Sequence, residues 1–231
     1  CDVYDNRNGQ YLKNREGGIS GMKIGDLYFS YRLERKKKTV DGQEKDGWLL
    51  SESYSTTGKE GSWNSPREIA FYPNVNFEGI GFRYNEKTRK VVLSAHYEDQ
   101  GGYTAAKIFL AQITPKGGIE IGTMERPLGH DSRDQSLFVD EDGTAYLLSA
   151  THMNSDINIY RLDETWTKPV ALANTICKGQ HRETPSILKK DGTYYFFSSK
   201  ASGWYPSQTM YASADRIDGK WSPLKEIGNN S

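Results

Sequence analysis

Four acidic residues, each at the head of a short run of β-forming residues, constrain the fold of this 231-residue chain more than any other feature. They are Glu16, Glu78, Asp134 and Glu183. In three of the four runs an arginine precedes the acid, and a glycine follows nine residues after it, before a second β-forming run. A repeated strand–turn–strand unit brings equivalent positions together in the folded protein. We therefore expect the four carboxylates to meet around one axis.

A second repeat, independent of the acids, marks the end of three of these units. Each has a tryptophan, a proline two or three residues later and an aliphatic residue six residues after the tryptophan: Trp63-Pro66-Ile69, Trp166-Pro169-Leu172 and Trp221-Pro223-Ile227. Four short strands in about 50 residues are typical of a β-propeller blade. The sequence predicts one all-β domain over residues 1–231, without amphipathic helices. Its blades are expected at about 15–70, 77–122, 133–173 and 182–228.

The first strand of a blade lines the central channel, so the four acids would crowd one mouth of it. The segments after the second strands would form the rim of this mouth: Tyr31–Arg32, His96–Tyr97, His152–Met153 and 200–205. Carboxylates surrounded by aromatic rings are what glycoside cleavage needs, because it takes an acid, a base and stacking platforms for the sugar. Close carboxylates also raise one another's pKa, which keeps one of them protonated as a general acid.

A structural interpretation of the acids is the alternative, in which Arg15, Arg133 and Arg182 pair with them and join the blades. Successive strand residues face opposite ways, so an arginine and the acid that follows it cannot share one side. The four histidines fall near predicted strand ends and lack metal-ligand spacing, so they predict hydrogen-bonding loop residues and no metal site.

The composition excludes several classes of protein. A formal net charge of zero gives no support for binding nucleic acid or an anionic membrane. No apolar stretch approaches the length of a membrane span. With only Cys1 and Cys177, a disulfide framework is excluded; a single bridge between them stays open, and Cys177 is interpreted as a buried or half-buried filler. Cys1 would suit a lipid-modified lipoprotein cysteine, so we expect a secreted, periplasmic or surface-anchored protein.

Several segments resemble glycoside hydrolase family 43. Residues 132–146, SRDQSLFVDEDGTAY, resemble its third-blade motif, and residues 181–187, HRETPSI, followed by 192–195 resemble its general-acid strand. Residues 202–214 and 77–88 are similar to the branch that holds exo-β-1,3-galactanases and related galactosidases. The similarity is strong over residues 130–215 and weak over residues 20–75.

This resemblance implies a five-bladed propeller, of which the chain represents about four blades, that hydrolyses glycosides with inversion. By position, Glu183 would be the general acid, Asp134 would raise its pKa and orient it, and Glu78 would contact the terminal sugar. Further candidates for substrate contact are Arg133, His96, His130, Trp204 and Tyr205. No metal is required, although some relatives hold a Ca²⁺ in the channel.

The general base is the open part of the resemblance. Most of the family takes it from a first-blade aspartate, whereas the galactanase branch is thought to use a fifth-blade glutamine. Where that branch reads His-Gly-Gly-Gly, this chain has Arg15-Glu16-Gly17-Gly18, so Glu16 either restores a base or pairs with an arginine. The chain ends where a fifth blade would begin, so we expect the intact protein to be longer.

The sequence as a whole favours an exo-acting, inverting glycoside hydrolase on galactose-containing glycans such as β-1,3-galactan and arabinogalactan. Its partner would be an oligosaccharide or polysaccharide. An α-L-arabinofuranosidase or β-xylosidase on the same fold is one alternative, and a non-catalytic carbohydrate-binding propeller is the other. Linkage specificity and oligomeric state are not encoded in any pattern found here.

Overall fold

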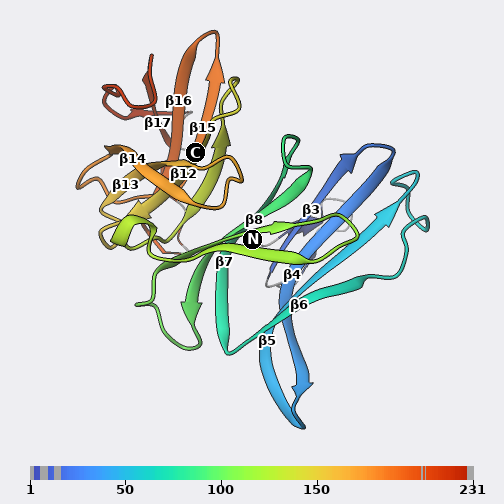
Figure 1. Cartoon of the computed structure of the whole chain (residues 1–231). Helices are drawn as coiled ribbons and strands as arrows, with labels where there is room; N and C mark the ends of the chain where they lie inside the picture. The colour runs from blue at the N-terminus through green and yellow to red at the C-terminus, as the bar shows by residue number, and fades with distance from the viewer. Residues whose placement is uncertain (1–2, 6–9, 13–16, 204, 206, 228–231) are drawn as a thin grey trace.

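The chain folds into β-strands arranged as consecutive antiparallel sheets (Figure 1). The computed structural model describes residues 3–5, 10–12, 17–203, 205 and 207–227. Within these residues there is no α-helix, only one 3₁₀ turn, Pro127–Gly129. The all-β prediction is therefore confirmed, and in the described part of the chain no helix has the length and apolarity to cross a membrane.

Each of the four large sheets is a meander in which strands pair in chain order. Blade one consists of β3 (Gly17–Ile24), β4 (Leu27–Val40), β5 (Gln43–Ser55) and β6 (Arg67–Pro73). Blade two consists of β7 (Val75–Asn85), β8 (Lys90–Asp99), β9 (Lys107–Ile113) and β10 (Ile119–Glu125). Blade three consists of β11 (Gln135–Val139), β12 (Ala145–Thr151), β13 (Asp156–Leu162) and β14 (Pro169–Ile176). Blade four consists of β15 (Arg182–Lys190), β16 (Thr193–Lys200), β17 (Met210–Ala214) and β18 (Lys225–Glu226), and a small hairpin of β1 (Val3–Asp5) and β2 (Gln10–Leu12) precedes them all.

The first strands of the blades lie side by side around one axis. β3 contacts β7, β7 contacts β11, and β11 contacts β15, although these strands belong to four different sheets. Successive sheets joined through their first strands are the arrangement of a β-propeller, with four blades in the described part of the chain. The residues at the start of these strands are therefore neighbours in space.

Hydrophobic clusters fill the three interfaces between successive blades. Because side chains alternate along a strand, one strand contributes to two interfaces. Leu147 faces the interface of blades two and three, and Leu148 faces that of blades three and four. Both side chains are fully buried. Sheets covered on both faces explain why the second strands read as nearly continuous apolar runs.

Two segments differ from the expected rim. The prediction that Tyr31–Arg32 forms a rim loop is wrong, because β4 continues to Val40 and Tyr31 is buried, with its hydroxyl donating to Glu52 at 2.8 Å. His96 and Tyr97 likewise lie within β8, which continues to Asp99.

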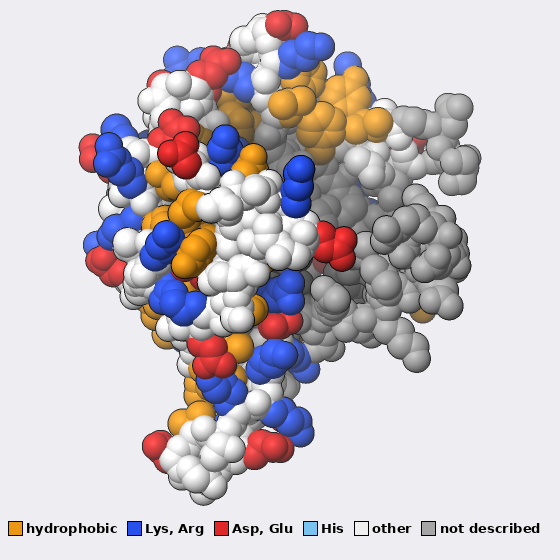
Figure 2. Space-filling view, turned by 90° about the vertical axis from the view of Figure 1, so that its right-hand side faces the viewer, with side chains coloured by type: hydrophobic (Ala, Val, Ile, Leu, Met, Phe, Trp, Pro, Cys, Tyr) orange, Lys and Arg blue, Asp and Glu red, His pale blue; other side chains and the backbone are white. Residues whose placement is uncertain are grey.

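The long β4–β5 hairpin projects from the bottom of the molecule in Figure 1. Its Lys36 and Lys37 lie within 4 Å of acidic side chains, Glu34 for the first and Glu44 and Asp46 for the second. Figure 2 shows basic and acidic side chains interspersed on this hairpin and on the face above it. No surface of a single charge that would suit a polyanion is visible on that face.

Cys177 has a free thiol and is half-buried against the cluster between blades three and four. Burial raises the pKa of this thiol to about 11. Cys1 lies outside the described residues.

Candidate active site

Glu78 and Glu183 lie at equivalent places near the start of β7 and β15. Each is followed by a residue in the left-handed region, Gly79 with φ +57° and Thr184 with φ +50°. In both strands the pairing register then shifts, as expected for a β-bulge. Bulges redirect side chains where a strand begins or ends. The same local irregularity therefore sets the direction of both carboxylates.

Asp134 joins this pair from blade three. Its Oδ2 accepts a hydrogen bond of 3.0 Å from the backbone N–H of Thr184, the residue after Glu183. Burial raises the pKa of Glu183, and the charges of Asp134 and Glu78 raise it further. The structure thus brings three of the four acids within electrostatic reach of one another. The fourth, Glu16, lies outside the described residues.

Asn154 also contacts Glu183, and the sequence analysis did not find it. Its side-chain amide donates to Oε1 of Glu183 at 2.9 Å. Asn154 lies in the β12–β13 turn, where three successive residues, His152, Met153 and Asn154, have left-handed φ angles of 50°, 56° and 62°. The turn contains no glycine, the residue type that would have indicated a left-handed conformation in the sequence.

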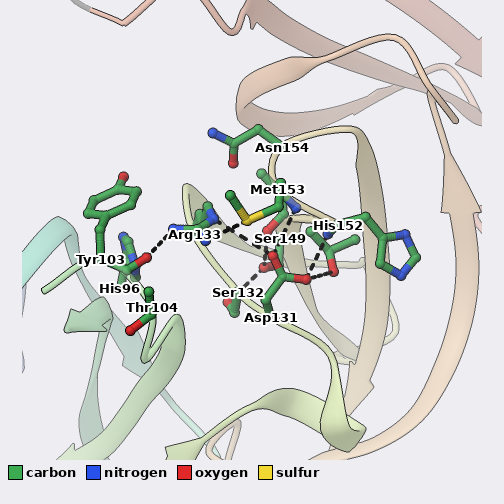
Figure 3. A network of polar contacts seen from close by, with 12 residues as sticks. His96, Tyr103, Thr104, Asp131, Ser132, Arg133, Ser149, His152, Met153 and Asn154 are labelled. Carbon is green, nitrogen blue, oxygen red and sulfur yellow. Dashed lines mark hydrogen bonds and ion pairs between the residues drawn. The ribbon is translucent and has the colours of Figure 1, made fainter. Parts of the chain in front are cut away.

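Asp131 holds the β12–β13 turn in place. Its carboxylate accepts hydrogen bonds from the Thr151 hydroxyl and from the backbone N–H groups of His152 and Met153, at 2.7 to 3.0 Å (Figure 3). Burial opposes ionisation, but these bonds outweigh it and lower the pKa of Asp131. The ionised form of Asp131 is thus favoured, and its hydrogen bonds stabilise the loop that presents Asn154.

Arg133 and Arg182 do not pair with the acids that follow them. Arg133 is 3% exposed and lies between two loops in Figure 3: it donates to the Tyr103 carbonyl at 3.1 Å and to the Met153 sulfur at 3.2 Å. Arg182 is also buried and donates to backbone and side-chain oxygens of blade four. The structural interpretation of Asp134 and Glu183 as partners of these arginines is thus not supported by the contacts observed.

Glu78 is half-exposed and has two polar neighbours at its Oε2. Nδ1 of His96 lies 3.3 Å away, and the Tyr103 hydroxyl donates to it at 3.2 Å. The His96 imidazole lowers the pKa of Glu78 against the effect of burial. Burial, together with the nearby charges of Glu78 and Asp134, raises the pKa of Tyr103 to about 12. Tyr103 is a member of the site that the sequence analysis did not name.

The remaining predicted contacts are placed as follows. His96 is fully buried behind Glu78, so it meets that carboxylate and has no surface open to a substrate. His130 lies against the rings of His152 and Tyr160. Tyr205 is 82% exposed, in the loop between β16 and β17. Trp204 lies outside the described residues. Among the residues that are described, no group of three or more His, Cys, Asp or Glu side chains could hold a metal ion.

The profile of glycosyl hydrolases family 43 matches residues 94–228, more than half of the chain. The chain belongs to this family. The match includes Asp134, Glu183 and Asn154. A search of curated proteins finds no significant match.

Solved members of family 43 share the fold over nearly the whole chain. An exo-β-1,3-galactanase from Clostridium thermocellum is 28% identical with a TM-score of 0.72, and the alignment covers 98% of this chain and 51% of that one. An exo-β-1,3-galactanase from Phanerochaete chrysosporium, solved with galactose, is 28% identical with a TM-score of 0.70, over 98% and 53% of the two chains. A family 43 β-1,3-galactosidase is 25% identical with a TM-score of 0.71, over 98% and 48%. The chain spans about half the length of these structures.

Proposed function

We propose that the protein is an exo-acting glycoside hydrolase that releases galactose from β-1,3-galactan with inversion of configuration. The observation that carries this proposal is the cluster of Glu183, Asp134 and Glu78, in which the pKa of Glu183 is raised. A carboxyl group that keeps its proton beside two other carboxylates is suited to general acid catalysis. The galactan specificity rests on the likeness to the family 43 galactanases.

In the proposed mechanism Glu183 protonates the glycosidic oxygen while the bond from that oxygen to the anomeric carbon breaks. Asn154 donates to Oε1 of Glu183, so Oε2 is the oxygen that carries the proton. Asp134 raises the pKa of Glu183 and holds the adjoining backbone at Thr184. Glu78 accepts a hydrogen bond from a hydroxyl group of the terminal sugar.

A water molecule attacks the anomeric carbon from the opposite face, and a base takes its proton. In inverting enzymes the acid and base carboxyl groups are about 6.5–9.5 Å apart, which leaves room for that water. Glu16 is the candidate base in this chain, and a residue of a further blade is the alternative. The variant Glu16→Gln in the full-length protein separates them: lost turnover supports Glu16, and wild-type turnover excludes it.

Two expectations follow from this chemistry. Acid and base catalysis needs no metal, so chelation with EDTA is expected to leave turnover unchanged; lost turnover restored by Ca²⁺ would assign a role to that ion. A polysaccharide does not enter cells intact, so we propose that the protein acts outside the cytoplasm.

The test of the function is hydrolysis by the full-length protein and its variant Glu183→Gln. We expect Glu183→Gln to lower kcat on β-1,3-galactan about 10²- to 10⁴-fold. The loss on an aryl β-galactoside should be smaller, because a phenolate leaves without a proton. Glu86→Gln, on the exposed β7–β8 turn, is the matched control and should be fully active.

Three outcomes would contradict this function. Equal losses on both substrates would remove Glu183 from the acid role. A wild type that binds galactan without cleaving it would identify a carbohydrate-binding propeller. Turnover of aryl α-L-arabinofuranosides or β-xylosides in preference to galactosides would move the substrate to another sugar.

A further inference from the structure

Glu98 is a buried carboxylate behind the candidate site, and the mechanism above does not use it. It lies two residues after His96 on β8, so both side chains share one face of the strand. Glu98 is 1% exposed and His96 is 0% exposed. Nε2 of His96 is 2.7 Å from Oε1 of Glu98, while its Nδ1 is 3.3 Å from Oε2 of Glu78. The imidazole therefore lies between two carboxylates, one buried and one open to the site.

An imidazole in this position satisfies both carboxylates only when both of its nitrogens carry a proton. A neutral ring would direct the lone pair of one nitrogen at a carboxylate oxygen. The Nδ1 contact has the length of an ion pair without full hydrogen-bond geometry, and in the described part of the chain Nδ1 has no other polar partner. Among the described residues, the side chain of Glu98 has two polar partners, the His96 ring and, at 3.7 Å, the Arg133 guanidinium.

The charges around the ring balance when His96 is protonated. Arg133 lies 3.7 Å from Glu98 and 3.7 Å from Asp131, so these two anions face the two cations Arg133 and His96. An unbalanced buried charge would be costly, and this arrangement avoids one. Of the three carboxylates Glu98, Asp131 and Glu78, Glu78 is then the one that is open to the site.

We propose that Glu98 and His96 form a positioning pair that holds Glu78 as an oriented, ionised acceptor for a hydroxyl group of the terminal sugar. This role rests on the proposed function, in which Glu78 contacts that sugar. Oε2 of Glu78 takes the contacts from His96 and Tyr103. No described residue donates a hydrogen bond to Oε1, so Oε1 is the atom presented to the sugar. Without the charge of Glu98, the ring loses its proton at Nε2 and keeps the one at Nδ1, which faces Glu78. A neutral hydrogen bond then replaces the ion pair that holds this carboxylate.

The protonation of His96 can be measured without any substrate. The chain has four histidines, so ¹⁵N-histidine labelling gives few imidazole signals, and a His96→Gln variant assigns those of His96. At neutral pH we expect two protonated nitrogens for His96 in the wild type and one unprotonated nitrogen in Glu98→Gln. A neutral His96 in the wild type, or unchanged signals in Glu98→Gln, would overturn the proposal. The wild-type spectrum tests whether both nitrogens of His96 are protonated, even if Glu98→Gln does not fold.

The consequence for the sugar is measured by galactose binding to protein that carries Glu183→Gln, which separates binding from turnover. Adding Glu98→Gln is expected to weaken galactose binding roughly tenfold, because a neutral imidazole holds the acceptor at Glu78 less firmly than a charged one. Asp99→Asn, the next residue on β8 and exposed on its opposite face, is the matched control and should bind galactose as before. Equal affinity in the presence and absence of Glu98→Gln would overturn the positioning role. Absence of galactose binding to the wild type would instead overturn the proposed function, whatever the charge of His96.

Discussion

Glu78 and Glu183 are the same residue type at equivalent strand positions, yet their surroundings move their pKa values in opposite directions. His96 beside Glu78 lowers the pKa of that carboxyl. Burial, followed by the charges of Asp134 and Glu78, raises the pKa of Glu183. Two carboxyl groups with separated pKa values supply a proton donor and an anion in one site at the same pH. The division of roles therefore comes from the surroundings of each glutamate: His96 on β8 beside Glu78, and burial with the nearby charge of Asp134, just before β11, at Glu183.

The variant Asp134→Asn is expected to move the alkaline limb of the pH–activity profile to lower pH. The negative charge at Asp134 contributes to the raised pKa of Glu183, so its removal lowers that pKa. The proton of Glu183 is then lost earlier as the pH rises, and activity falls with it. An asparagine oxygen can still accept from the Thr184 N–H, which preserves the local geometry.

This shift is measured as kcat/KM for β-1,3-galactan across pH, because the leaving sugar of this substrate needs the proton of Glu183. The control is Asp142→Asn, on the exposed turn between β11 and β12, for which we expect the wild-type profile. An alkaline limb that stays in place in Asp134→Asn would show that another group sets it.

The sequence could locate the acids because a repeat of strands fixes the positions at which each strand begins. It could not locate Tyr103 or Asn154, which belong to loops whose course depends on left-handed turns and on contacts between blades. Glu98 is an intermediate case. Its spacing from His96 predicts that both side chains lie on one face of a strand. The sequence does not predict that both are buried there.

At the scale of a strand, the bulges in β7 and β15 are the elements that direct the two glutamates. Gly79 adopts its left-handed conformation at little cost, whereas Thr184 is a β-branched residue in a region that such residues rarely enter. A threonine gives no warning of a bulge, so only the one in β7 has a sequence signature. The hydrogen bond from the Thr184 N–H to Asp134 is one contact that holds the strained residue in place.

The variant Gly79→Ala is expected to lower the free energy of unfolding by about 1–2 kcal/mol, because a left-handed φ is unfavourable for alanine. Space is not the cause, since the nearest atom to an added Cβ would be the Gln135 Nε2 at 3.9 Å. The strain would also turn the adjoining Glu78, so galactose should bind more weakly. Urea unfolding and calorimetric titration with galactose measure the two effects.

Gly21→Ala is the matched control for this strand effect. Its added Cβ would also have its nearest neighbour at 3.9 Å, the Phe29 carbonyl oxygen, but Gly21 lies in β3 without a positive φ. We expect no loss of stability in this variant. A similar loss in both variants would attribute the effect to the added methyl group and not to the bulge.

The whole molecule is stabilised by contacts between blades, because each blade is a single sheet that cannot bury both of its faces alone. The interface of blades two and three is held by more than its hydrophobic cluster. Thr123 on β10 donates its hydroxyl to the Thr167 carbonyl at 2.5 Å, and Asn85 at the end of β7 donates to the Glu164 carbonyl at 3.0 Å. The repeated tryptophan of blade three, Trp166, packs into the same interface.

Gly122→Ala is expected to separate blades two and three, because an added Cβ would overlap the Thr167 side chain and lie 2.9 Å from its carbonyl oxygen. Overpacking of this kind costs roughly 1–3 kcal/mol. Urea unfolding followed by tryptophan fluorescence should show a lower midpoint or two transitions, as the interface that couples the blades weakens. Gly118→Ala is the control, since no atom lies within 4 Å of its added Cβ. A midpoint equal to that of Gly118→Ala would show that the interface accommodates the added methyl group without loss of stability. The contact between residue 122 and Thr167 would then not couple the two blades.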